Sequence, residues 1–277
     1  MIPLSFPDFD IVYQDSVSLL LNHWTVEMQQ RMAVHGHGWS PGLFDVPNYL
    51  RCSSTRFYRV YLKAAERGTE QTLCDVGGQM GVLSVTLSKL GFDVTMTETL
   101  KYYGDLFKEF FECIAAQGVK LVDYDPFEPE AQLTRKFDFI SVMAVIEHYP
   151  HSLKSFMGNI MQLMNPEARI YIEVPNIAYF PKRLRMLLGH TPLAPVKDIF
   201  LSEVPFIGHH HEFTISELRD LVHLSGLAIR EESFYNYSLN CQPFWKKLVR
   251  YALEPAFLAL KDSRECMAVL CERSADC

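Results

Sequence analysis

The fold is decided by a glycine-rich stretch, LCDVGGQMG, at residues 73–81. An apolar run ends at Asp75 and breaks into a turn, and a helical pattern begins at Val82. This arrangement lets backbone N–H groups approach a small ligand closely. A second apolar run, residues 93–97, ends in Glu98, whose carboxylate can accept both hydroxyl hydrogens of a ribose. Together the two features predict a nucleoside-containing cofactor.

The glycine turn has other interpretations. It also fits an ordinary strand-to-helix connection, because glycine tolerates positive φ in any tight turn. It is not the GxGxxG fingerprint of dinucleotide-binding proteins. No Tyr-x-x-x-Lys set follows the fourth predicted strand, so a nicotinamide-dependent oxidoreductase is the weaker alternative.

Downstream, apolar strands alternate with amphipathic segments. The pattern predicts strands at residues 120–124, 136–143 and 169–174, and helices at 82–90, 105–117 and 152–164. Such alternation is typical of a parallel sheet with helices on both faces. Ligands then bind beyond the carboxyl ends of the strands. Asp75, Glu98, Asp125 and Met143 all fall there.

The motifs and their order carry a family resemblance. The glycine loop reads Asp-x-Gly-x-Gln-x-Gly, with Gly77 and Gly81 matched, Gly78 one place early and Gln79 in the place of the middle glycine of Asp/Glu-x-Gly-x-Gly-x-Gly. FDFI, VIEHY and LMNPEARIYIEVPN follow within residues 137–176, and TISEL begins at residue 214. In this order the segments resemble the small-molecule branch of class I S-adenosylmethionine (SAM)-dependent methyltransferases. The resemblance covers residues 71–176, residues 208–234 and the last strand.

The resemblance implies a Rossmann-like, doubly wound α/β sheet of seven strands, mostly parallel with an antiparallel last strand. An N-terminal helical cap (residues 1–70) would precede a SAM-binding domain (71–277) with an inserted lid (178–208). The activity implied is methyl transfer to a small molecule or a glycan- or lipid-linked metabolite, with oxygen as the acceptor atom. The residues implied to bind SAM are Asp75, Gly77, Gly78, Gln79, Gly81, Glu98, Asp125, Met143 and Glu147.

Two histidines are candidate catalytic bases, because a hydroxyl acceptor must lose a proton. His148 follows the fourth strand directly after Glu147, and we expect it nearest to the transferred methyl group. His209 matches the family's histidine before the TISEL helix. The alternative is that Glu147 and His148 cap a turn and form part of the pocket wall.

We expect no metal. The triple histidine at residues 209–211 suggests a metal site, but adjacent loop residues rarely all face one ion. Metal-dependent relatives carry Glu-x-x-Glu-His, and here Ala144 stands in the place of the first Glu. One hard oxygen ligand is therefore missing. Ala144 and Gln79 also leave open a non-catalytic protein of this fold that binds a partner.

Composition limits the remaining choices. The chain has 277 residues, 48% of them hydrophobic, which suffices for one large core. Its net charge is −7 and its densest basic cluster is Lys182, Arg183 and Arg185, so we expect no nucleic-acid partner. Seven scattered cysteines without a CxxC pair predict a reducing, cytoplasmic location without structural disulfides. The first ten residues show no signal peptide.

Several segments keep alternative interpretations. The proline-rich insertion 178–208 is either a lid beside the acceptor or a cover without contact to it. A predicted helix at 243–261 could touch a membrane, but we expect a core or dimer contact; the sequence does not fix the oligomeric state. Residues 15–32 are predicted to form one helix, and the glycine loop 35–42 is predicted to be solvated rather than part of a lid. Arg56 would either pair with the cofactor's carboxylate or lie on a helix surface.

Overall fold

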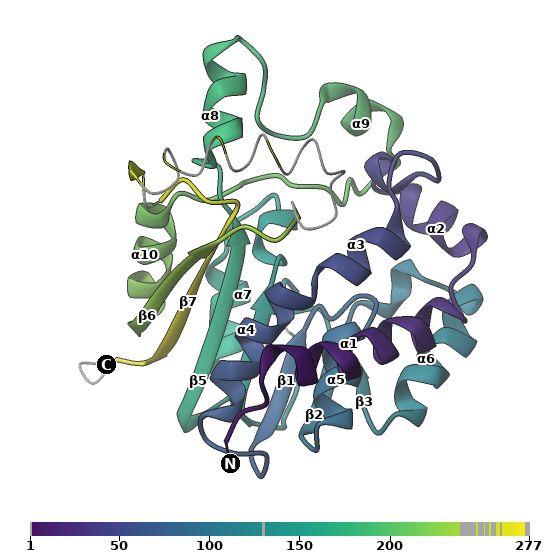
Figure 1. Ribbon diagram of the computed structural model, residues 1–277, viewed down its shortest axis with the longest axis vertical. Coiled ribbons are helices and arrows are strands. Elements are labelled where there is room, and N and C mark those ends of the chain that lie inside the picture. The colour runs from purple at the N-terminus through teal and green to yellow at the C-terminus, as the bar shows by residue number, and fades with distance from the viewer. Residues whose placement is uncertain are drawn as a thin grey trace.

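The computed structural model describes residues 2–128, 131–238, 248, 252, 255, 259–260 and 262–274 of the chain. Its centre is a seven-stranded sheet in the order β3-β2-β1-β4-β5-β7-β6 (Figure 1). The strands are β1 (Thr72–Val76), β2 (Asp93–Glu98), β3 (Lys120–Asp123), β4 (Phe137–Met143), β5 (Met164–Pro175), β6 (Leu227–Tyr235) and β7 (Cys266–Arg273).

One strand runs against the others. β7 lies between β5 and β6 and pairs antiparallel with both, from Arg169 opposite Glu272 to Pro175 opposite Cys266 on the β5 side. The pairs among β1 to β5 are parallel. The predicted fold class, a doubly wound sheet with an antiparallel last strand, is confirmed.

Helices cover both faces of the sheet, as Figure 1 shows. On one face, α1 (Phe6–Leu21), α4 (Ser54–Ala65), α5 (Val82–Lys89) and α6 (Lys108–Ala116) bury apolar side chains against β1 and β2. On the other face, α7 (Lys154–Gln162) and α10 (Ile215–Leu224) pack against β4, β5 and β7. Two apolar clusters therefore enclose the sheet.

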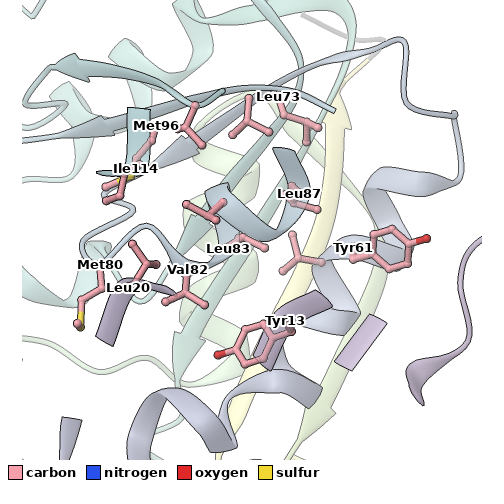
Figure 2. Close-up of a cluster of buried hydrophobic side chains, with 14 of the residues drawn as sticks. Tyr13, Leu20, Tyr61, Leu73, Met80, Val82, Leu83, Leu87, Met96 and Ile114 are labelled. Carbon is pink, nitrogen blue, oxygen red and sulfur yellow. The ribbon is translucent and has the colours of Figure 1, made fainter. Parts of the chain in front are cut away.

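The strands serve both clusters because side chains alternate along a strand. In β1, Leu73 belongs to the first cluster and Cys74 to the second. Figure 2 shows Leu73 and Met96 of the sheet meeting Leu83 and Leu87 of α5, with Tyr13 and Tyr61 of α1 and α4 on the outer side. The N-terminal helices thus share a core with the cofactor sheet. The division at residue 70 stays a prediction.

The N-terminal segment differs from the single helix predicted at residues 15–32. The structure has α1 and then α2 (Val26–Ala33), because Thr25 caps a new helix by accepting the Met28 N–H. Two short helices follow, η1 (His37–Trp39) and α3 (Val46–Cys52). The prediction of one continuous helix is wrong, since a cap breaks the apolar periodicity.

The later helices mostly follow prediction. Thr214 and Glu217 form a capping box at the start of α10. The insertion contains two helices, α8 (Phe180–Leu187) and α9 (Val196–Leu201). The remaining short helices are η2 (Leu100–Tyr102), η3 (Asp105–Phe107) and η4 (Ile146–His148). The predicted helix at 243–261 lies outside the described residues except at positions 248, 252, 255 and 259–260.

Two further observations concern the environment of the chain. Among the described residues, no helix combines the length and apolarity that crossing a membrane requires. Cys52 is disulfide-bonded, so the expectation of no structural disulfide is wrong, whereas Cys74, Cys113, Cys266 and Cys271 are free. The cytoplasmic location stays a prediction.

Candidate active site

A cavity of about 670 Å³ opens at the carboxyl ends of the central strands. The ends of β1, β2, β4 and β5 form its floor, and segments from the N-terminal helices and the insertion form its walls. It is lined by all but one of the residues predicted to act in the site, namely Asp75, Gly77, Gly78, Gln79, Glu98, Asp125, Met143, Glu147, His148 and His209. The remaining one, Gly81, is not part of the lining.

The glycine turn needs its small residues for two reasons. Gly77 has φ of 65°, and a Cβ there would stand 2.9 Å from Cγ2 of Val145. Gly81 has φ of 68° and begins α5, where a Cβ would stand 2.6 Å from Cδ1 of Ile114. Both conformation and space therefore exclude larger residues. Gly81 shapes the turn from behind rather than facing the cavity.

Gln79 keeps the turn open although it replaces a glycine. Its φ is 49°, the left-handed conformation that glycine adopts most readily. Its N–H donates to Oε2 of Glu98 at 2.7 Å, which holds the loop against the end of β2. The substitution at this position thus leaves the loop in the conformation that the motif requires.

Asp75 is turned into the protein. Its two carboxylate oxygens accept hydrogen bonds from Ser84 at 2.7 Å and from Ser141 at 2.8 Å. Burial raises the pKa of Asp75, and the two hydroxyl groups oppose that rise. The carboxylate therefore ties β1 to α5 and β4, and its main effect on the cavity is to position the glycine turn.

Glu98 is the carboxylate best placed for a ribose. Its oxygens accept the N–H groups of Gln79 at 2.7 Å and of Thr99 at 3.1 Å. Burial raises the pKa of Glu98 to about 7, against the opposing effect of these bonds and of the Tyr103 hydroxyl. Hydroxyl donors from a ligand would favour its ionised form.

Asp125 lines the cavity beyond β3. Its Oδ1 accepts the Phe127 N–H at 3.0 Å, which shapes a turn, and its Oδ2 lies 3.5 Å from Nζ of Lys101. The ring of Phe127 stacks on Tyr149 with a centroid distance of 4.1 Å. A carboxylate beside stacked rings suits a flat heterocycle that carries an amino group.

Glu147 is fully buried, and its carboxylate lacks a hydrogen-bond partner among the described residues. Burial raises the pKa of Glu147 to about 7, with His209 the largest opposing influence. The backbone of Glu147 is occupied, since its carbonyl accepts the His210 N–H at 2.7 Å. A buried carboxylate left open in this way is available to a ligand.

His209 has the geometry of an oriented base. Its Nδ1 lies 2.9 Å from Oε1 of Glu212, and its Nε2 lies 4.0 Å from Oε1 of Glu147. Glu212 also pairs with Lys182. The Glu212 carboxylate holds Nδ1 as the protonated nitrogen, which leaves Nε2 free to accept a proton at the cavity wall.

His148 is the second candidate base and lies against His209. Burial, reinforced by His209, lowers the pKa of His148 to about 3. Its ring meets that of His209 edge to face, 4.8 Å between centroids, and its Nδ1 has no hydrogen-bond partner among the described residues. A pKa shift in this direction favours the uncharged ring. That His148 lies nearest to the transferred methyl group stays a prediction.

The same side chains are the described residues that could hold a cation. Glu147, His148 and His209 place one ligand atom each within 4.8 Å of one another. Ala144, where a second carboxylate would complete the set, offers no ligand atom. Its φ of 54° instead turns the chain between β4 and η4. That no metal binds here stays a prediction.

Sequence analysis missed a buried ion pair in the floor of the cavity. Arg56 of α4 pairs with Glu173 of β5, with Nη2 2.6 Å from Oε1. Arg56 also donates to the Tyr49 hydroxyl at 2.9 Å, and Tyr235 donates to Glu173. Arg56 is buried, so the prediction of a place on a helix surface is wrong. It also lines the cavity, and its pairing with the cofactor's carboxylate stays a prediction. Its role is to join the N-terminal helices to the sheet.

The N-terminal loop at residues 35–42 contacts the insertion at residues 178–208. The Ile207 N–H donates to the His35 carbonyl at 2.6 Å, the Glu203 N–H to the Val34 carbonyl at 2.7 Å, and the His37 N–H to Oγ of Ser202 at 2.9 Å. His35 and Ile207 line the cavity. The prediction of a solvated loop is therefore wrong, because two segments far apart in sequence close one side of the cavity together.

Comparison with known proteins gives one family and many solved structures. The family described as "Methyltransferase domain" matches residues 50–232, more than half of the chain. Among curated proteins, none matches significantly.

Three solved structures have a similar fold. Magnesium protoporphyrin IX methyltransferase (ChlM) from Synechocystis PCC 6803 with bound S-adenosylhomocysteine (SAH) is 16% identical over 88% of this chain and 93% of that one, with a TM-score of 0.52. A putative sarcosine dimethylglycine methyltransferase from Galdieria sulphuraria is 15% identical over 89% and 98%, with a TM-score of 0.53. The glycopeptide N-methyltransferase MtfA in complex with SAH is 10% identical over 80% and 90%, also with 0.53. At these identities the likeness shows the fold.

Proposed function

The chain belongs to the class I SAM-dependent methyltransferases, and on that premise we propose that it methylates a hydroxyl oxygen of a small-molecule acceptor. The observation that carries the proposal is the contact of Nδ1 of His209 with Glu212, 2.9 Å long, at the wall of the cavity. Oxygen acceptors need such a base more than neutral amines do, since an amine nitrogen attacks with its own lone pair.

The residues present fit the cofactor. Gly77 and Gly78 line the cavity with backbone alone, and a Cβ at Gly78 would stand 2.7 Å from Cγ of Met96, inside the protein. Glu98 would accept the ribose hydroxyls, and Asp125 would accept from the adenine amino group. Met143 and Gln79 would enclose the rest of the nucleoside. Bound SAM supplies an activated methyl group, and the protein must align the acceptor with it.

The acceptor's proton would pass to His209. As the oxygen–methyl bond forms and the sulfur–methyl bond breaks to leave SAH, Nε2 of His209 would take the hydroxyl proton and the ring would become an imidazolium. Glu212 accepts the Nδ1–H, so it fixes the tautomer and stabilises that charge. Glu147 lies beside the same nitrogen, and its open oxygens can hydrogen-bond a second polar group of the acceptor.

The cavity walls suggest an acceptor with a planar or apolar body. Five aromatic side chains are among the residues that line the cavity, namely Trp39, Phe44, Tyr49, Phe206 and Tyr237. Trp39 and Phe44 contact each other with a centroid distance of 4.6 Å. Such walls bury ring systems and hydrocarbon well. They would also exclude water, which otherwise competes with the acceptor for the methyl group.

The test screens hydroxylated aromatic compounds against their amine counterparts and follows SAH formation. With the best acceptor, His209→Ala should lose turnover about 10²–10⁴-fold while keeping SAH affinity in titration calorimetry, as expected for general-base catalysis. His211→Ala is the matched control, since His211 is half exposed and lies 3.4 Å from Glu217 outside the cavity lining. Turnover of amines alone, or full activity in His209→Ala, would reject the proposed oxygen chemistry.

A further inference from the structure

The insertion carries an unusual share of exposed apolar side chains. Four lie within residues 184–188 of α8 and its end, and five within residues 196–204 of α9 and the following loop. These nine are more than half of the seventeen large apolar side chains exposed among the described residues. Leu187 is 82% exposed and Phe200 is 84% exposed. We name the nine the insertion patch; clusters of this kind mark interaction sites.

The patch lies next in sequence to residues of the cavity wall. Figure 1 shows α8 and α9 together at one end of the molecule, away from α1, α4 and the N-terminus. The hydrogen bonds from Glu203 and Ile207 to the loop at residues 34–35 hold this segment. Phe206 and Ile207, directly after the patch, line the cavity. A surface that covers the patch therefore lies close to this part of the cavity wall.

The charge of the insertion is opposite to that of the chain. Residues 178–208 hold four basic and two acidic residues, a net charge of +2, whereas the whole chain carries −7 and the remainder therefore −9. Lys182 and Arg183 pair with Glu212 and Asp262. Arg185 and Lys197 are exposed and have no ion pair within the part of the chain that the structure describes.

We propose that the insertion patch docks on an anionic lipid bilayer. Exposed leucine and phenylalanine side chains with free basic residues among them match the apolar interior and the negative headgroups of such a surface. A second copy of the chain fits less well, because it would bring the same basic side chains against Arg185 and Lys197. The contact is interfacial and involves two short helices and a loop.

Docking would present the cavity to the bilayer. An acceptor with a hydrocarbon or isoprenoid body could then enter between Phe206 and the aromatic walls without crossing water. This consequence for the substrate rests on the proposed methyl transfer, whereas the docking itself does not. The two are therefore tested by separate measurements.

The experiment is sedimentation of the full chain with phosphatidylcholine vesicles, with and without about 30% phosphatidylglycerol. The wild-type chain should pellet with the anionic vesicles and be released by raised salt. Leu187→Gln with Phe200→Gln should weaken binding by about tenfold or more. Arg185→Gln with Lys197→Gln should weaken it about fivefold for each side chain removed. SAH affinity should stay unchanged in all of these variants.

Matched controls lie elsewhere on the surface. Leu224 of α10 is 83% exposed and Lys154 of α7 is exposed, so Leu224→Gln and Lys154→Gln repeat the chemical changes outside the patch. They should bind vesicles as the wild type does. No sedimentation of the wild type, an equal loss in Leu224→Gln, or a dimer in light scattering that Leu187→Gln dissociates would overturn the proposal. Failure of SAH to bind would reject the proposed function while leaving the vesicle result to stand alone.

Discussion

Replacing Glu147 by glutamine should stabilise the protein in a pH-dependent way. The Glu147 carboxyl is fully buried without a hydrogen bond among the described residues, and its pKa is raised from 4.5 to about 7. The folded state therefore holds the proton more tightly than the unfolded chain. Stability is lost as pH rises from the unfolded pKa through the folded one, because the fold must then accommodate a buried charge. Glutamine has the same shape and does not ionise.

The magnitude follows from the two pKa values. At 1.36 kcal/mol per pKa unit, the rise from 4.5 to about 7 corresponds to roughly 3 kcal/mol of unfolding free energy above pH 7. At pH 5 most of this cost is absent, so Glu147→Gln should gain about 2.5 kcal/mol more at pH 8 than at pH 5. The cost of burying an amide without partners is the same at both pH values and cancels in the difference.

Urea unfolding of both proteins at the two pH values measures this difference. Glu109→Gln is the control for the loss of one negative charge, since Glu109 is exposed on α6. An equal change in unfolding free energy at pH 5 and pH 8 would show that Glu147 does not hold a proton in the folded protein. A cation or a further hydrogen-bond donor beside the carboxylate would then have to stabilise the ionised form of Glu147.

Three more predictions concern the cofactor, the loops and the metal. Glu98→Ala should lose about 1.5–3 kcal/mol of SAH affinity in calorimetry at pH 8. Wild-type affinity should fall below pH 7 as Glu98 takes up a proton, and the variant should lose that pH dependence. Amide exchange at residues 34–39 and 202–207 should slow when SAH and acceptor bind, and equal protection in all states would contradict a gating role. Turnover should survive EDTA, and a loss that Mg²⁺ restores would show that Glu147, His148 and His209 hold a metal.

The sheet could be predicted because its signals are local. The apolar runs that form β1 and β2, and the periodic helices between strands, need no knowledge of distant residues. The errors arise where a cap or an exposed apolar residue breaks the pattern. Thr25 divides the first helix, and Leu106, within the helix predicted at 105–117, is 49% exposed in η3. α9 was missed because its apolar residues face outward, against the periodicity of a buried helix.

The sequence predicted those site residues that stand directly after the ends of the parallel strands. Parallel strands bring Asp75, Glu98 and Met143 to one edge, so their place in the lining could be expected. What could not be expected is which polar groups pair with each other. The pairs Arg56–Glu173 and Ser141–Asp75 join residues far apart in sequence, and no periodicity connects them. Asp75 therefore lines the cavity as predicted, but its carboxylate oxygens bond Ser84 and Ser141 inside the protein.

Two backbone hydrogen bonds directly after His209 attach the end of the insertion to the core of the protein. The Glu147 carbonyl accepts the N–H groups of His210 at 2.7 Å and His211 at 3.3 Å, which anchors the end of the insertion to the end of β4. Motion of α8 and α9 would thus stop at residue 208. Because Glu212 orients the ring from the far side of this anchor, the base keeps its place whether the insertion is open, closed or lying on a bilayer. The same backbone bonds bring the free nitrogen of His209 to the open carboxylate of Glu147, so the acceptor would meet both groups at one rigid corner of the cavity.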